Sequence, residues 1–256
     1  MVDPAGSIRD RLDPRTFLAL LLAGLVGVLA VLPYQFALTG WPSADALPLV
    51  LALTLIQNAV LIGLAVVVGL ALGPLVGFRV YAPASVPTTY GRAVALGVAF
   101  GVVVLAIDAL VFAPFVRDAV LGGAVLPVQP NRGEAAWLGL LASLYGGVTE
   151  ELLLRFGLMT LLAWVGWHLS GRPTELPAGV AWASILIAAA LFGLGHLGAT
   201  AAVLELTPAV LVRMLVLNGI GVVAFGWLYW PYDVVSAMVA HFTGDVVLHV
   251  IAVLVA

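Results

Sequence analysis

Seven long apolar runs follow one another along the chain, separated by short segments rich in Gly, Pro and charged residues. A helix needs about 20 apolar residues to cross the hydrocarbon core of a bilayer. Each run is at least that long, so each predicts a transmembrane helix. The runs cover residues 16–38, 46–73, 91–116, 134–169, 178–203, 207–230 and 234–256.

The fourth run is too long for one upright span. At 1.5 Å per residue, a helix over 134–169 would be about 54 Å long, against a hydrocarbon core of about 30 Å. We expect it to bend or split near Gly146-Gly147 or near Gly157. The pattern therefore predicts an all-α fold, a polytopic transmembrane bundle of seven or eight helices.

Composition supports a lipid environment and excludes several kinds of chemistry. The chain is 63% hydrophobic and 9% charged, whereas a soluble domain carries about 25% charged residues. The net charge of −3 and the lack of a basic patch argue against a nucleic-acid partner. There is no Cys, which excludes disulfides, thiolate zinc sites and a Cys nucleophile.

The predicted organisation has three parts. Residues 1–15 form a polar N-terminal tail, 16–133 hold three spans, and 134–256 form a helical core. The tail carries Arg9, Arg11 and Arg15, which favours a cytoplasmic N-terminus for a multi-pass protein of the cell membrane.

Charged residues and histidines within the spans concentrate in the last part of the chain. A charge at mid-membrane costs about 2.5–3.5 kcal/mol on insertion scales, so such a residue needs a partner or a water-filled cavity. We therefore expect a buried polar cavity in the C-terminal half. Away from the ends of the runs, the charged residues and histidines are Asp108, Glu150, Glu151, Arg155, His196, Arg213, His241, Asp245 and His249.

The sequence Glu150-Glu151-Leu-Leu-Leu-Arg155 contains two adjacent carboxylates for which we expect different roles. Adjacent residues on a helix point about 100° apart, and Arg155 is four residues after Glu151, the favourable spacing for an ion pair. We expect Glu151 and Arg155 to support the structure and Glu150 to remain free as a general base for water. The alternative is an ion-paired structural cluster without chemistry.

Two further pairs have the i, i+4 spacing that places side chains on one face of a helix. Phe192 and His196 form one pair, and His241 and Asp245 form the other. His249 continues the second stripe and is interpreted as a bystander near the end of its span. One acid, two histidines and an Asp on three apolar segments are hard to explain by packing alone.

These three elements together resemble the CAAX prenyl endopeptidase and bacteriocin-processing (Abi) family of intramembrane proteases. The matching motifs are EELLLR at 150–155, FGLGH at 192–196 and HFTGD at 241–245. The resemblance implies a helical bundle with a water-accessible cavity. It assigns Glu150 to activating water, His196 to supporting that water, and His241 with the residue at 245 to holding the oxyanion.

Two points of the chemistry stay open, namely the role of Asp245 and the participation of a metal. The family's eukaryotic prenyl proteases have Asn where this chain has Asp245, and an ionised Asp cannot donate to an oxyanion. Asp245 would be protonated, orient His241, or bind a metal. Glu150, His196, His241 and Asp245 could hold a divalent ion such as zinc, and a metal-free glutamate mechanism is equally compatible with the sequence.

The sequence thus predicts an endopeptidase that hydrolyses a membrane-associated or lipid-anchored protein or peptide. Two alternatives stay open. Buried Glu, His and Asp residues also form proton relays, so a proton-coupled transporter or channel with Asp108, Arg213 and Asn218 along its path is one. A non-catalytic immunity or scaffold protein of the same family is the other.

Overall fold

All regular elements in the described part of the computed structural model, residues 11–82, 86–116 and 131–255, are helical. Seven of these helices are long and apolar enough to cross a membrane, which confirms the predicted all-α bundle. The first three spans are α2 (Pro14–Thr39), α3 (Leu47–Leu72) with the 3₁₀ turn η1 (Gly73–Val76), and α4 (Val86–Ile107) with η3 (Asp108–Phe112) and α5 (Ala113–Val116). The fourth comprises α6 (Arg132–Leu144), η6 (Tyr145–Glu150), η7 (Leu152–Met159) and α7 (Thr160–Leu169). The last three are α8 (Ala178–Gly195) with α9 (Leu197–Ala201), α10 (Pro208–Tyr229), and α11 (Val234–Val246) with η8 (Val247–Ile251) and α12 (Ala252–Val255).

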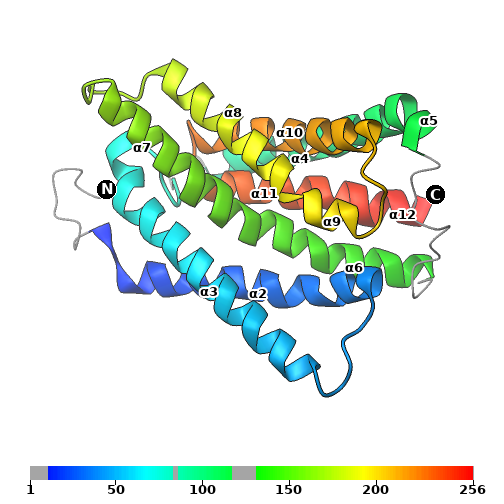
Figure 1. Ribbon diagram of the computed structural model, residues 1–256. Helices are drawn as coiled ribbons and strands as arrows, with labels where there is room; N and C mark the ends of the chain where they lie inside the picture. The colour runs from blue at the N-terminus through cyan, green and yellow to red at the C-terminus, as the bar shows by residue number, and fades with distance from the viewer. Residues whose placement is uncertain (1–10, 83–85, 117–130, 256) are drawn as a thin grey trace.

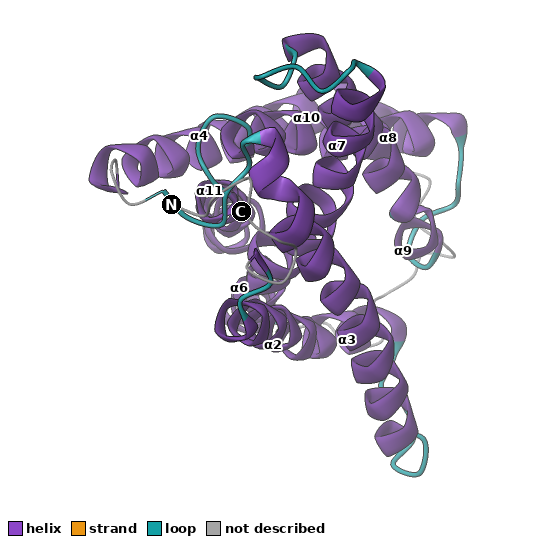
Figure 2. Ribbon diagram, turned by 90° about the vertical axis from the view of Figure 1, so that its left-hand side faces the viewer, coloured by secondary structure: helices purple, strands orange, loops and turns teal. Residues whose placement is uncertain are grey.

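The fourth span is the centre of the bundle. Its successive segments contact α2, α3, α8 and α11, and Figure 2 shows α6 and α7 between these neighbours. On the other side, α11 packs along α4, and α10 packs along α8. The start of α2 and the end of α12 lie at opposite ends of the bundle (Figure 1), as an odd number of spans requires.

Where a bend or split of the fourth span was expected, the helix changes from α-helical to π-helical pitch. The span runs from Arg132 to Leu169 as one helix of 38 residues, so the described residues hold seven spans and no eighth. Gly146-Gly147 lie in the π-helical segment η6, and Gly157 lies in the π-helical segment η7. A π turn changes the direction of side chains while the backbone groups remain hydrogen-bonded, which the membrane interior requires.

Polar caps fix where the spans begin. The Asn131 side chain accepts from the backbone N–H of Glu134 at 3.0 Å, and Thr207 caps α10 in the same way. Asp233 accepts from the backbone N–H of Ser236 at 2.7 Å and also from that of Ala82 at 2.8 Å. This second bond joins the segment after η1 to the start of α11, the helix that carries His241.

Small residues bring the helices of the site close together. Gly97 on α4 lies against the backbone carbonyl of Ala240 on α11, and Gly139 on α6 lies against the carbonyl of His249. A side chain at either glycine would separate the two backbones, as at other small-residue contacts between membrane helices. These approaches set the position of α11 relative to the fourth span.

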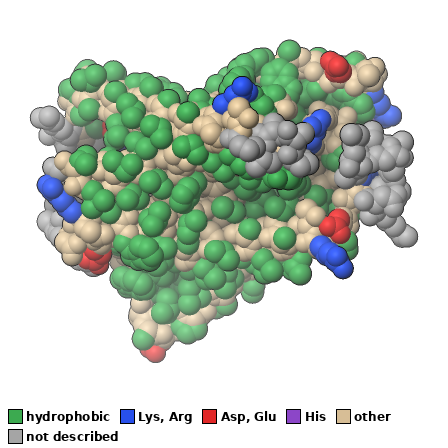
Figure 3. Space-filling view, turned by 180° about the vertical axis from the view of Figure 1, so that it is seen from behind, with side chains coloured by type: hydrophobic (Ala, Val, Ile, Leu, Met, Phe, Trp, Pro, Cys, Tyr) green, Lys and Arg blue, Asp and Glu red, His purple; other side chains and the backbone are tan. Residues whose placement is uncertain are grey.

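The outer surface is apolar over the middle of the bundle. In Figure 3 hydrophobic side chains cover the broad central belt, and most charged side chains on that face lie towards the ends. Large side chains such as Leu53, Ile56, Val60 and Leu110 are exposed. An exposed apolar belt of this extent is stable in lipid. The chain is therefore a multi-pass membrane protein.

Candidate active site

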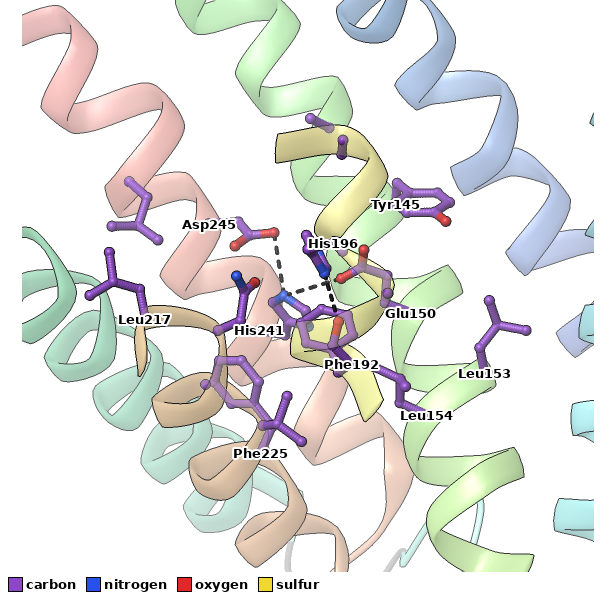
Figure 4. Close-up of a pocket in the computed structure, with 18 of the residues that line it drawn as sticks. Tyr145, Glu150, Leu153, Leu154, Phe192, His196, Leu217, Phe225, His241 and Asp245 are labelled. Carbon is purple, nitrogen blue, oxygen red and sulfur yellow. Dashed lines mark hydrogen bonds and ion pairs between the residues drawn. The ribbon is translucent and has the colours of Figure 1, made fainter. Parts of the chain in front are cut away.

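A cavity of ≈ 610 Å³ lies between the central span, α2, α4 and the last three spans. This volume is in the range of sites that bind small molecules and peptides. Most of the wall is apolar. Glu150, His196, His241 and Asp245, the four residues predicted from the sequence to be catalytic, all line the cavity, and Figure 4 shows them facing the same space.

His241 is the residue at which the polar groups meet. Its Nδ1 atom lies 2.6 Å from Oε1 of Glu151. Its Nε2 atom faces the cavity, 3.8 Å from Oε2 of Glu150 and 3.6 Å from Oδ2 of Asp245. The ring stacks on Phe225, with centroids 4.7 Å apart. One nitrogen is thus anchored in the protein, and the other is presented to the site.

The Glu151 carboxylate holds His241 in place, and the Arg155 guanidinium balances the charge of Glu151. Oε1 of Glu151 lies 2.8 Å from Nη1 of Arg155, and the two side chains are 0% and 1% exposed. The Arg155 guanidinium also lies over the Phe225 ring, 5.4 Å from its centroid. A carboxylate accepts hydrogen bonds only, so the bond to His241 is donated by the imidazole Nδ1–H. The i, i+4 spacing predicted the pair with Arg155 but not the bond to His241.

Glu150 and Glu151 have different surroundings, although they are adjacent. Glu150 ends the π-helical segment η6 and lines the cavity, with its side chain 15% exposed. Glu151 is fully buried behind the imidazole of His241. Glu150 is therefore the carboxylate that water or a substrate can reach.

His196 ends α8 and extends into the same part of the cavity as Glu150 and His241 (Figure 4). Its Nδ1 atom is 3.0 Å from the backbone carbonyl of Phe192, and its ring meets the Phe192 ring edge to face at 4.3 Å. A carbonyl only accepts, so Nδ1 carries the proton, and Nε2 of the neutral imidazole is left as an acceptor. The sequence predicted that these two side chains share a face.

Gly146 provides the space in which His241 and Asp245 meet. Oδ2 of Asp245 lies directly against the place that a Cβ atom at position 146 would occupy, and Nε2 of His241 is 3.2 Å from it. From the sequence, Gly146-Gly147 were expected only to bend or split the span. The sequence signal for this close approach was the pair of glycines shortly before the intramembrane carboxylate Glu150.

Other polar residues of the cavity were missed or interpreted differently from the sequence. His249, interpreted as a bystander, lines the cavity, and its ring centroid is 6.4 Å from that of Tyr34. Tyr145 also lines it, one turn before Glu150. Arg213 lines it and is paired with Asp108 from η3.

The predicted metal ligands do not form a metal site as they stand. No three His, Asp or Glu side chains in the ranges 11–82, 86–116 and 131–255 are placed to hold one ion.

Comparison with known proteins agrees with the motifs. Residues 132–247 match the family model described as Rce1-like, type II CAAX prenyl endopeptidase. The matched segment includes all seven residues that the motifs single out, while the first three spans lie outside it. No curated protein and no solved structure matches the chain. Residues 132–247 of this membrane protein thus match the Rce1-like type II CAAX prenyl endopeptidase family, the family that the motifs indicated.

Proposed function

We propose that the chain is an intramembrane endopeptidase in which Glu150 activates water. The observation that carries this proposal is the position of Glu150 in the cavity, 3.8 Å from Nε2 of a histidine whose other nitrogen is held by Glu151. Separations of 3.6 and 3.8 Å are too long for direct hydrogen bonds, and such gaps between polar groups are places where water bridges.

In the proposed hydrolysis, Glu150 accepts a proton from water and His241 donates a hydrogen bond to the oxyanion. Glu150 takes a proton from the water as its oxygen attacks the scissile carbonyl carbon. The carbonyl oxygen becomes an oxyanion and accepts from Nε2–H of His241. Glu150 then delivers the proton to the leaving amide nitrogen as the C–N bond breaks. The products are a carboxylic acid and an amine, Glu150 is regenerated as a carboxylate, and the acid then passes its remaining proton to the amine or to water.

His241 is suited to the donor role because of its neighbours. As an imidazolium it donates from both nitrogens, through Nδ1 to Glu151 and through Nε2 to the oxyanion. The Phe225 ring against its face and the bond to Glu151 fix its orientation. A donor held in place before the reaction stabilises developing charge without reorganisation.

His196 and Asp245 flank the reacting water. The free Nε2 acceptor of His196 holds one water hydrogen and directs a lone pair at the substrate. Asp245 is the second carboxyl group facing Nε2 of His241. It orients the imidazole in the resting enzyme, and in its protonated form it can donate to the oxyanion alongside His241.

The substrate is a membrane-associated or lipid-anchored protein or peptide. The cavity walls are mostly apolar and the surrounding surface faces lipid, so a hydrophobic segment enters at a lower desolvation cost than a soluble peptide. The basic residues of the tail favour a cytoplasmic N-terminus, and we propose the cell membrane as the location.

The proposal is tested with purified protein in liposomes and a pool of peptides. Each peptide carries an N-terminal palmitoyl chain and ten randomised C-terminal residues, and the reaction runs in water enriched in ¹⁸O. Hydrolysis by water predicts new C-terminal carboxylates that carry ¹⁸O, found by mass spectrometry only in liposomes with the protein.

Two results would contradict hydrolysis. Proton-gradient-driven uptake of a solute without any cleavage would instead support a transporter. Intact peptides and no transport would support a non-catalytic scaffold or immunity protein.

A further inference from the structure

The two ends of the bundle differ in their number of arginines. At one end α2, α4, α8 and α11 begin and α3, α7 and α10 end, and Figure 1 shows α2 beginning and α7 ending on this side, at the left. The described arginines next to these helix ends are Arg11, Arg15, Arg79, Arg92 and Arg172. The opposite end has fewer, because the segment from the third to the fourth span carries only Arg117 and Arg132. We call the first of these the basic end, and such an excess of Arg favours the cytoplasmic side.

The cavity extends from the catalytic residues away from the basic end. His241 is 241 − 234 = 7 positions from the start of α11, about 10 Å at 1.5 Å per residue. The other cavity residues of this span, Asp245, Leu248 and His249, follow His241 towards the opposite end. On the fifth span the lining residues lie within 191–199, in the last part of that span. The catalytic residues are therefore at the inner end of the cavity.

Polar side chains line the cavity near the end of the bundle opposite to the basic end. Gln35 is exposed and lies 39 − 35 = 4 positions before the end of α2. Arg213 is 29% exposed and lies 213 − 208 = 5 positions after the start of α10. Both are thus about 6–8 Å along their helices from that end. Polar residues within spans face protein or a water-filled cavity, so this part of the cavity is suited to admit water.

The shorter path from His241 to the basic end is filled by buried side chains. Val234 and Ala237, which precede His241 on α11, are both 0% exposed. Phe78 and Tyr229 are 1% and 0% exposed, and their ring centroids are 4.7 Å apart. The described residues on this side of the imidazole thus form a packed apolar layer rather than a channel.

The segment that follows η1 is bonded to the start of α11 at the basic end. The backbone N–H of Ala82 donates to the Asp233 carboxylate at 2.8 Å, and the backbone N–H of Val234 donates to the carbonyl of Arg79 at 3.1 Å. These bonds join parts of the chain that are about 150 positions apart in sequence. They hold the segment over the apolar layer and keep the basic end closed.

We propose that the active site opens on the non-cytoplasmic side of the membrane and takes an exported, membrane-anchored protein or peptide as its substrate. Three observations support this proposal: the arginines favour a cytoplasmic basic end, the path to that end is filled, and the cavity extends to the other end. A substrate anchored in the outer leaflet reaches the cavity without crossing the membrane. Cleavage of that substrate rests on the proposed endopeptidase function, whereas the side of the opening does not.

Labelling of single cysteines measures the side from which water enters the cavity. The chain has no Cys, so each variant carries one thiol. Ala142→Cys lies on the cavity wall, Ser43→Cys in the exposed segment between α2 and α3, and Ser170→Cys in the exposed turn after α7 at the basic end. Val60→Cys, on an exposed apolar position of α3, is the control for a thiol in lipid. The reagent is a membrane-impermeant maleimide, which reacts with the thiolate form.

The proposal predicts a specific pattern in spheroplasts of a bacterial expression host. Ser43→Cys and Ala142→Cys should react in intact spheroplasts, and Ser170→Cys should react only after permeabilisation. Val60→Cys should stay unlabelled in both states, because a thiol in hydrocarbon remains protonated. Labelling of Ala142→Cys only after permeabilisation would overturn the proposal. Labelling of Ser170→Cys in intact spheroplasts, or of Ala142→Cys in neither state, would overturn it as well.

Cleavage from the two sides of the membrane tests the substrate class. The palmitoylated peptide pool is added to spheroplasts and to inverted membrane vesicles, with membranes that contain Glu150→Gln as the background. Spheroplasts should release fragments, and inverted vesicles should do so only after detergent is added. Cleavage by intact inverted vesicles but not by spheroplasts would overturn the proposal. The predicted labelling without any cleavage in detergent would support the outward opening and refute the endopeptidase function.

Discussion

Replacing Gly146 with Ala tests whether the meeting point of His241 and Asp245 is the reaction centre. The new methyl group would occupy the place against which Oδ2 of Asp245 now lies. It would also approach Nε2 of His241 at 3.2 Å, which is tighter than an ordinary van der Waals contact. The Asp245 side chain must therefore move from its present place beside the imidazole.

The size of the effect follows from the displacement. Restoring a normal contact moves the carboxylate by roughly 1 Å, and a misplacement of about 1 Å in a catalytic arrangement costs about 100-fold in rate. Helix propensity acts in the opposite direction, because Ala is more favourable than Gly in a helix interior by up to about 1 kcal/mol. We expect a large loss of activity in a protein that still folds and inserts.

The assay compares cleavage of the palmitoylated peptide pool with thermal unfolding in detergent. Gly219→Ala is the matched control, because a Cβ atom at that position of α10 would meet nothing within 4 Å. Gly219→Ala should retain the wild-type rate. Unchanged cleavage by Gly146→Ala would refute the placement of the reaction at this point.

Three further variants separate the roles of the site residues. Glu151→Gln leaves the buried Arg155 without a counter-charge and should lower stability by about 3–5 kcal/mol; adding Arg155→Met should restore the melting temperature but not cleavage, and recovery of both would contradict the anchoring of His241. His196→Phe keeps an aromatic ring beside Phe192 and removes the acceptor, so cleavage should fall by about 100-fold with unchanged unfolding; a near wild-type rate would remove His196 from the mechanism. Asp245→Asn keeps the shape and gains a donor, so it should retain activity within about tenfold, while Asp245→Ala should lose about 100-fold; equal rates for the two would exclude a polar role.

The spans and the local pairs were predictable because their signals are local. Each span is encoded by the length and hydropathy of its own residues. The Glu151–Arg155 pair is likewise encoded by a spacing of four residues within one helix. The shared face of Phe192 and His196 is of the same kind.

Contacts between helices distant in sequence were not predictable in this way. The bond of Glu151 to His241 joins residues 90 positions apart, and it depends on how α11 packs against the central span. Asp108 and Arg213 were noted as intramembrane charges, yet their pairing requires η3 and α10 to be neighbours. Of the two outcomes expected near Gly146-Gly147 or Gly157, a bend or a split, the split does not occur, because π turns accommodate these glycines without leaving backbone groups unpaired.

The most direct measurement of the central claim is cleavage of the peptide pool by Glu150→Gln beside Glu134→Gln, a change at an exposed residue in the first turn of the same span. Loss of the general base predicts a fall of about 100- to 10,000-fold in the rate for Glu150→Gln, with unfolding unchanged. Glu134→Gln should cleave at the wild-type rate, and a chelator should leave the wild-type rate unaltered. Cleavage by Glu150→Gln at the wild-type rate would contradict the account.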